Sequence, residues 1–255
     1  MPGLRSAEGS LRQNRRLKKA NLNRETIINQ PVKGIVHKLL RESDFGEALK
    51  QIRALPPKKT INALLPKLLS LDHEEKWRAV SAAGVAVCDL AAYDLEAARI
   101  IIRRMIWNLT EESGTCGWGA AELMAETLAN HRGLAEEFSN ILISFIVPEG
   151  NYLEFEPLQR GAVWGIGRLA ESYPDLAGDS PPYLCALLKS NDAHIRGLAC
   201  HALMCMSSVP CLDLLGDLTK DTAEITLFAR RKLQTVKVGD LAREALAIPG
   251  AGSPS

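Results

Sequence analysis

The sequence is poor in aromatic residues and lacks any apolar run long enough for a membrane span. Phe, Trp and Tyr together make up 5% of the 255 residues. The longest strongly apolar run, residues 141–147, is far shorter than the roughly 20 residues that a bilayer-spanning helix requires. The basic N-terminus also lacks the apolar segment of a secretory signal peptide. These absences predict a cytoplasmic protein with no membrane span.

Paired cysteine motifs are missing too. None of the six cysteines forms a Cys-x-x-Cys pair, and most lie in apolar, helix-like stretches, where cysteine behaves as a small apolar residue. We therefore expect free thiols in a reducing compartment. The six are Cys88, Cys116, Cys185, Cys200, Cys205 and Cys211.

The chain has no strong net charge, but its charge is unevenly distributed. Residues 1–24 contain seven basic side chains and one acidic side chain, a local charge of +6. Because the whole chain carries +1, the remaining residues together carry −5. This acidic body argues against a nucleic-acid groove between its helices. The polar residues 1–25 predict a disordered basic arm, which could bind nucleic acid or anionic lipid, or serve only for solubility.

The sequence does contain a nine-residue pattern that recurs four times along the chain. The copies span 76–84, 117–125, 158–166 and 194–202, with Arg78, Gly119, Arg160 and Arg196 at equivalent positions. The steps between these positions are 41, 41 and 36 residues, a range typical of two-helix solenoid repeats. Helix pairs of this length bury their apolar faces only by stacking, so the pattern predicts a curved rod with a concave surface.

Apolar periodicity and the positions of Gly and Pro divide the chain into segments. After the arm at 1–25 we expect an N-terminal helical cap at 26–58, in which Asp44 begins a short helix. Four helix pairs follow over 59–210. Their two helices are expected at 61–70 and 74–92 in the first pair, 95–109 and 117–130 in the second, 134–147 and 157–172 in the third, and 183–189 and 193–207 in the fourth. A C-terminal cap at 211–247 contains a β-hairpin, 224–228 with 232–238, and a last helix at 240–247. Residues 248–255 are expected to form a flexible tail.

The segment 192–203 resembles the second helix of a HEAT repeat, in which Asp, an aliphatic-Arg pair and spaced alanines recur. Over a longer span, stretches such as 103–107, 117–120 and 164–169 resemble phycobilisome-lyase-type HEAT-like proteins of sulfate- and metal-reducing bacteria. The resemblance and the repeats together imply an all-α fold, a right-handed α-α superhelix (HEAT-like solenoid) with a small C-terminal β-hairpin plus helix. The family label refers to repeat shape and implies no chemistry by itself.

The strongest candidate for a binding site is a stripe of residues on the third repeat. Arg160, Trp164 and Arg168 are spaced i, i+4, i+8 and therefore share one face of the helix at 157–172. An indole between two guanidinium groups could stack a flat ligand or a partner's aromatic side chain and bind a carboxylate or phosphate. The structural alternative is an ion pair from Arg160 to a neighbouring acid and a Trp164 that fills a gap between helices.

Further residues complete the candidate concave face. Glu122 and Glu126 lie at i, i+4 on the equivalent helix of the preceding repeat. They could place two carboxylates beside that stripe, or they could form a solvated surface. Trp118 lies just before them, near the expected groove. His201 and Cys205 also share a helix face, but no second cluster with metal-ligand spacing accompanies them. For these two we expect core packing, and for the chain no metal and no cofactor.

The predicted function is a HEAT-type scaffold or adaptor, a monomer that binds another protein along its concave face without catalysis. One alternative is lyase-like or chaperone-like handling of a tetrapyrrole or another flat anionic cofactor, which follows from the resemblance and the Arg-Trp-Arg stripe. If the chain is an enzyme, this is the activity that we expect of it. A second alternative is nucleic-acid binding through the basic arm.

Overall fold

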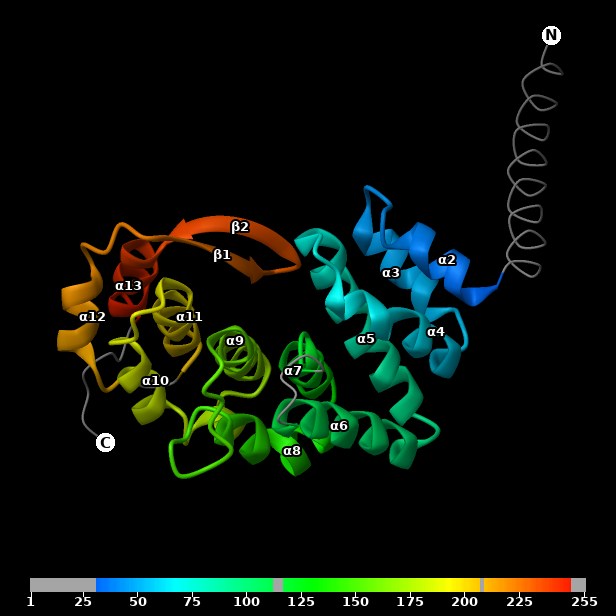
Figure 1. Ribbon diagram of the computed structural model, residues 1–255, viewed down its shortest axis with the longest axis horizontal. Helices are drawn as coiled ribbons and strands as arrows, with labels where there is room; N and C mark the ends of the chain where they lie inside the picture. Colours follow the sequence, from blue (N-terminus) through cyan, green and yellow to red (C-terminus); the bar gives the residue numbers. More distant parts are fainter. Residues whose placement is uncertain (1–30, 112–116, 207–208, 249–255) are drawn as a thin grey trace, which may run out of the picture.

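The computed structural model describes residues 31–111, 117–206 and 209–248. Its helices form an arc, and a two-stranded hairpin spans the open side of that arc (Figure 1). The predicted helical solenoid with a small C-terminal hairpin and a following helix is therefore confirmed. The predicted arm at 1–25 and almost all of the tail at 248–255 lie outside the described residues.

The elements follow the predicted order of helix pairs. The chain begins with α2 (Val32–Leu39) and α3 (Phe45–Arg53). The pairs are α4 (Pro57–Leu64) with α5 (His73–Ala91), α6 (Leu95–Thr110) with α7 (Ala120–Asn130), α8 (Arg132–Ser144) with α9 (Glu156–Ser172), and α10 (Pro181–Leu187) with α11 (Ala193–Met204). Short 3₁₀ helices, η1 (Leu65–Leu69) and η2 (Pro174–Ala177), follow α4 and α9. The chain then continues through α12 (Leu212–Leu218), β1 (Glu224–Ala229), β2 (Lys232–Lys237) and α13 (Val238–Leu246).

The second helices of the pairs form an inner layer. Helices α5, α7, α9 and α11 pack against one another in this order, whereas α6, α8 and α10 lie on the outer side of the arc (Figure 1). Helix α7 lies in the middle of the inner layer and is buried from Ala120 to Ala129. The hairpin faces this inner layer. Within the described ranges, no helix is both long and apolar enough to cross a membrane.

Aspartate side chains cap the N-termini of several helices. The side chain of Asp44 accepts a hydrogen bond of 3.0 Å from the backbone N–H of Glu47, as the sequence predicts. Asp72, Asp94 and Asp192 do the same at the starts of α5, α6 and α11. Such a cap satisfies a backbone donor that has no partner within the helix.

Small residues allow the inner helices to approach closely. A Cβ atom added to Gly84 of α5 would lie 2.6 Å from Cγ of Glu126 on α7. At the start of α7, Gly119 has a φ of 76°, and an added Cβ would lie 2.8 Å from Cβ of Leu68. A larger residue at either position would force the neighbouring segments apart. The low aromatic content of the chain is consistent with this close packing.

The hairpin is short and packs against the inner helices. Strands β1 and β2 are antiparallel, with Glu224 opposite Lys237 and Ala229 opposite Lys232. Ile225, Leu227 and Phe228 of β1 are buried. An isolated two-stranded hairpin is marginally stable in water, so this packing is what holds it in place. The following helix, α13, packs on α11 and α12.

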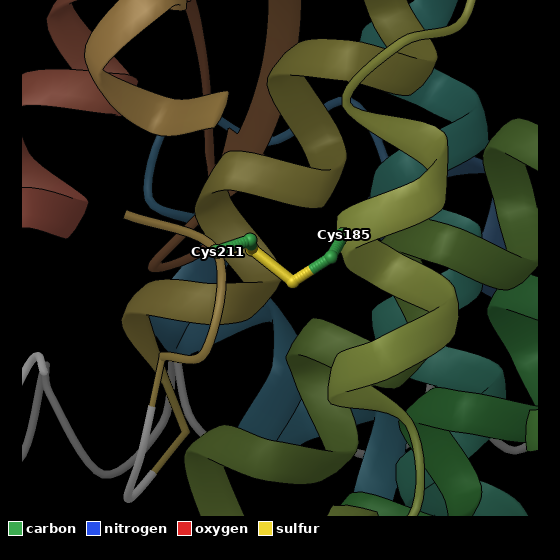
Figure 2. The surroundings of a disulfide bond; sticks show 2 residues. All are labelled: Cys185 and Cys211. Carbon is green, nitrogen blue, oxygen red and sulfur yellow. A yellow bond between two sulfur atoms is a disulfide. The ribbon is translucent and has the colours of Figure 1, made fainter. Parts of the chain in front are cut away.

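The prediction of free thiols is wrong for two cysteines. Cys185 of α10 and Cys211, just before α12, form a disulfide with a Cα–Cα distance of 5.8 Å (Figure 2). The two residues are 26 positions apart and show no motif, so only the folded chain reveals their proximity. Cys88, Cys200 and Cys205 are free, and Cys116 lies outside the described residues.

Candidate functional site

Arg160 lies in an ion pair between consecutive repeats. Its Nε donates a hydrogen bond of 2.8 Å to Oδ2 of Asp192, the cap of α11. At the equivalent position of the next repeat, Arg196 Nη2 lies 2.7 Å from Oδ2 of Asp221. Burial raises the pKa of the Asp192 carboxyl. The hydrogen bonds from Arg160 and from two backbone N–H groups outweigh this effect and hold that pKa below its usual value. The Arg160 side chain therefore has the partner that the structural alternative proposes.

The two predicted glutamates lie between the inner helices. Glu122 is 6% exposed, and its Oε1 accepts a hydrogen bond of 2.8 Å from Nζ of Lys76 on α5. Glu126 is 3% exposed, and its Oε2 accepts one of 2.8 Å from Nε of Arg168 on α9. Each carboxylate therefore joins α7 to one neighbour through a charge-assisted hydrogen bond. The structure thus brings Glu126 and Arg168 together but pairs Glu122 with a lysine outside the predicted set.

Trp164 is enclosed by aromatic side chains. Its ring centroid lies 4.5 Å from that of Trp77, which stacks on Phe228 of the hairpin at 4.7 Å. Its Nε1–H donates a hydrogen bond of 2.7 Å to the carbonyl oxygen of Phe228. The side chain is 4% exposed and thus has little free surface for stacking a flat ligand. Trp118, in contrast, lies in the turn before α7 and is 45% exposed.

A cavity of about 170 Å³ lies beside this aromatic group, where the hairpin tip reaches the inner helices. Its lining includes Trp164, Arg168 and Glu126 of the predicted set. The hairpin contributes Arg230 and Arg231. Two further cavities adjoin the tip: one of about 970 Å³ includes Arg230, and one of about 480 Å³ includes Arg231. Each arginine therefore lines the 170 Å³ cavity and one of the two further cavities.

Arg230 and Arg231 have an unusual backbone conformation. Their φ angles are 51° and 61°, in the left-handed region that glycine and asparagine favour. A two-residue hairpin turn with positive φ at both positions normally contains Asn-Gly. Both arginine side chains are exposed, and neither forms an ion pair with the residues that the structure describes.

These arginines are absent from the set of site residues predicted from the sequence. The Arg-Arg pair between two alternating segments was nevertheless a usable signal, because these residue types are disfavoured in such a turn.

Among the residues that the structure describes, those that could hold a metal form one group. Glu171 of α9 approaches His201 and Cys205 of α11, and the potential ligand atoms lie within 4.8 Å of one another. Burial lowers the pKa of His201, which favours the neutral imidazole. Glu171 and His201 also line the 170 Å³ cavity.

Comparison with known proteins identifies the repeat type. Residues 156–204 match the HEAT-like repeat family, and this segment contains α9, α10 and α11. No curated protein matches the chain in sequence. The matched segment includes Arg160, Trp164 and Arg168.

Solved structures with similar shape are distant in sequence. An engineered protein is 18% identical with a TM-score of 0.49, over 85% of this chain and 95% of that one. A designed armadillo repeat protein, solved in complex with a (KR)4 peptide, is 15% identical with a TM-score of 0.44, over 85% and 98%. The archaeal HEAT-like repeats protein of Thermococcus onnurineus NA1 is 14% identical with a TM-score of 0.31, over 86% and 100%.

Proposed function

We propose that this chain is a HEAT-type scaffold that binds an acidic segment of another protein on its inner surface, around the hairpin tip, without catalysis. The observation that carries the proposal is the pair of exposed arginines, Arg230 and Arg231, each of which lines the 170 Å³ cavity and one further cavity. An extended segment could pass from one cavity to the next and contact both guanidinium groups.

The charge of the hairpin supports an acidic partner. Residues 224–237 contain four basic side chains and one acidic side chain, a local charge of +3 on a body that is otherwise acidic. Arginine forms planar, bidentate pairs with carboxylates and is weakly hydrated for a cation, so it suits such an interface. The left-handed backbone at the turn favours other residue types. The presence of two arginines there is therefore consistent with a role in binding rather than in hairpin formation.

The residues predicted from sequence take different parts in this proposal. Trp164, Arg168 and Glu126 would form the wall of the central cavity. Glu122 and Arg160 would support that wall through their ion pairs with Lys76 and Asp192. Trp118 would add a separate exposed contact at the start of α7.

The flat-cofactor alternative receives less support. A tetrapyrrole stacked on Trp164 would have to displace the aromatic contacts of that ring with Trp77 and the hydrogen bond to Phe228. Nucleic-acid binding by the arm remains a separate hypothesis that concerns residues 1–25. A cytoplasmic location also remains a prediction, against which the Cys185–Cys211 disulfide weighs because such bonds are rare in that compartment.

The proposal is tested with fluorescent peptide pools of equal length and different charge. We expect the acidic pool to bind and the basic and neutral pools to bind weakly, as judged by fluorescence anisotropy. The variant Arg230→Asn/Arg231→Gly keeps a favourable turn and removes both guanidinium groups. It should weaken binding of the acidic pool by about tenfold or more, because a hydrogen bond to a charged group contributes roughly 1.5–3 kcal/mol.

The matched control is Lys33→Gln/Lys38→Gln. It removes the same charge from two exposed positions of α2 and should leave binding nearly unchanged. Equal losses in the two double variants would mean that the peptides respond to net charge alone. If the arginine variant still binds the acidic pool as tightly as the unchanged chain, the hairpin tip is not part of the interface.

A further inference from the structure

We propose that Glu171, His201 and Cys205 bind one Zn²⁺ ion, with the fourth coordination position directed to the 170 Å³ cavity. This site shares the 170 Å³ cavity with the proposed partner surface, but its three ligands do not include the arginines of the hairpin tip, so Zn²⁺ binding can be tested without a partner. It also revises the expectation that His201 and Cys205 serve only in packing.

The positions of the three side chains follow from the helix stack. His201 and Cys205 lie at i, i+4 and therefore share one face of α11. Glu171 lies in the last turn of α9, which packs directly against α11. Nε2 of His201 is 3.9 Å from Oε1 of Glu171, and all three ligand atoms lie within 4.8 Å of one another.

Only small movements would complete the site. Zn–N and Zn–O bonds of about 2.0 Å and Zn–S bonds of about 2.3 Å place tetrahedral ligands roughly 3.3–3.8 Å apart. A pair of ligand atoms at the upper limit of 4.8 Å would thus have to close by about 1.0–1.5 Å. Rotation about side-chain bonds would have to supply this change.

The state of the imidazole ring supports the assignment. The Nδ1 atom of His201 is buried and has no hydrogen-bond partner among the described residues. Its Nε2 is nearest to a carboxylate oxygen, at a distance too long for a hydrogen bond. Buried polar atoms are nearly always paired, so a ring with this much unused bonding capacity needs an explanation. A metal ion between the ring and Glu171 would bind Nε2 and account for that nitrogen, whereas Nδ1 would keep no partner among the residues that the structure describes.

The surrounding charges suit a divalent ion. A thiolate from Cys205 and a carboxylate from Glu171 together balance the charge of Zn²⁺. The nearby Arg168 is already paired with Glu126 at 2.8 Å. Its Nη1 lies 3.5 Å from Oε2 of Glu171, so the guanidinium holds one carboxylate oxygen while Oε1 faces His201. Outer contacts of this kind orient ligating carboxylates.

The ligand types select the metal class. Calcium and magnesium prefer oxygen ligands, whereas a set of one sulfur, one nitrogen and one oxygen suits zinc. Zinc sites with three protein ligands keep a fourth position for water or another small ligand. Glu171 and His201 line the cavity, so that position would open into it.

The test is a titration of the metal-stripped full chain with Zn²⁺ in competition with a coloured chelator, under conditions that keep the disulfide intact. We expect one equivalent to bind. Co²⁺ in its place should produce the near-ultraviolet absorption of a thiolate–cobalt bond. The variants Cys205→Ser, His201→Gln and Glu171→Gln should each weaken Zn²⁺ binding by more than about 100-fold, since loss of outer contacts alone costs 10–100-fold.

The control is Cys88→Ser, which removes another free and partly buried thiol on α5 and should bind Zn²⁺ as the unchanged chain does. Circular dichroism without metal shows whether each variant folds. A second measurement needs no variant: bound Zn²⁺ should slow alkylation of Cys205 but not of Cys88, as followed by mass spectrometry. Zn²⁺ binding that is unaffected in Cys205→Ser, or alkylation of Cys205 that is unaffected by Zn²⁺, would overturn the proposal.

Discussion

At the scale of single residues, partners from distant parts of the sequence decide what a side chain does. Trp164 bonds to the Phe228 carbonyl 64 positions away, and Glu122 pairs with Lys76 46 positions away. Helical spacing predicts that Trp164 shares a face with Arg160 and Arg168. It contains no information about which neighbour covers that face. The close approach of α5 to α7 at Gly84 is equally dependent on tertiary packing.

Two glycine substitutions should therefore have opposite effects on stability. Gly84→Ala places a methyl group 2.6 Å from Cγ of Glu126 and near the α7 backbone, so we expect a loss of about 1–3 kcal/mol. Gly34→Ala lies on the exposed side of α2 with nothing within 4 Å of the added Cβ. It should stabilise the protein by about 0.5–1 kcal/mol through higher helix propensity. Urea unfolding followed by circular dichroism measures both, and effects of the same sign would contradict this account of the helix contact.

At the scale of elements, the hairpin combines a predictable pattern with an unexpected position. The alternation in 224–228 and 232–238 predicts the strands closely, because period-two patterning is a local property. The sequence also suggests a different kind of unit at the end of the repeats. It does not show that the hairpin crosses the arc and stacks Phe228 on Trp77 of α5. That contact requires the curvature of the whole stack.

The arginine turn should reduce stability in exchange for binding. Replacing Arg230 by Asn and Arg231 by Gly supplies residue types that tolerate positive φ, so the double variant should be more stable by about 1–2 kcal/mol. The same variant should bind the acidic peptide pool more weakly. Denaturant unfolding gives the first quantity and anisotropy the second. A variant that is both less stable and weaker in binding would show that the arginines make contacts important for folding.

At the scale of the whole molecule, ion pairs join consecutive repeats along the stack. Arg160–Asp192 links α9 to α11, and Arg196–Asp221 links α11 to the segment before β1. For Arg160, an ion pair to a neighbouring acid is the structural alternative that the sequence suggests. The acids are found only in the structure, because they lie 32 and 25 positions away from their arginines.

This ladder should make the fold sensitive to acid. Burial raises the pKa of Asp221, but hydrogen bonds from the Ala223 N–H and from Arg196 outweigh it and hold the pKa below its usual value of 3.8. The unfolded chain therefore takes up protons at a higher pH than the folded chain does. Stability contributed by Asp221 and Asp192 should be complete above about pH 5 and fall progressively as pH decreases through 4 and below.

Urea unfolding at a series of pH values measures this dependence. Asp221→Asn should lower stability at neutral pH and flatten the fall between about pH 5 and 3. The exposed Asp213 of α12 forms no ion pair with the described residues, so Asp213→Asn is the matched control and should leave the profile unchanged. An Asp221 variant with the full acid dependence would show that other carboxylates govern it.

Much of the architecture was determined by the sequence itself. Helix pairs, aspartate caps and the hairpin depend on periodicity and capping within a few residues, and such signals survive in a single sequence. The repeat length likewise indicated that the helix pairs stack into a curved rod.

The tertiary structure alone decided which of those residues remain available for chemistry. Burial of Glu122, Glu126 and Trp164, formation of the Cys185–Cys211 bond and the approach of Glu171 to His201 all join segments far apart in the chain. Whether a helix face is open or covered depends on the curvature of the stack and on the element that crosses it. In this protein that element is the hairpin, which fills part of the concave side and presents two arginines there.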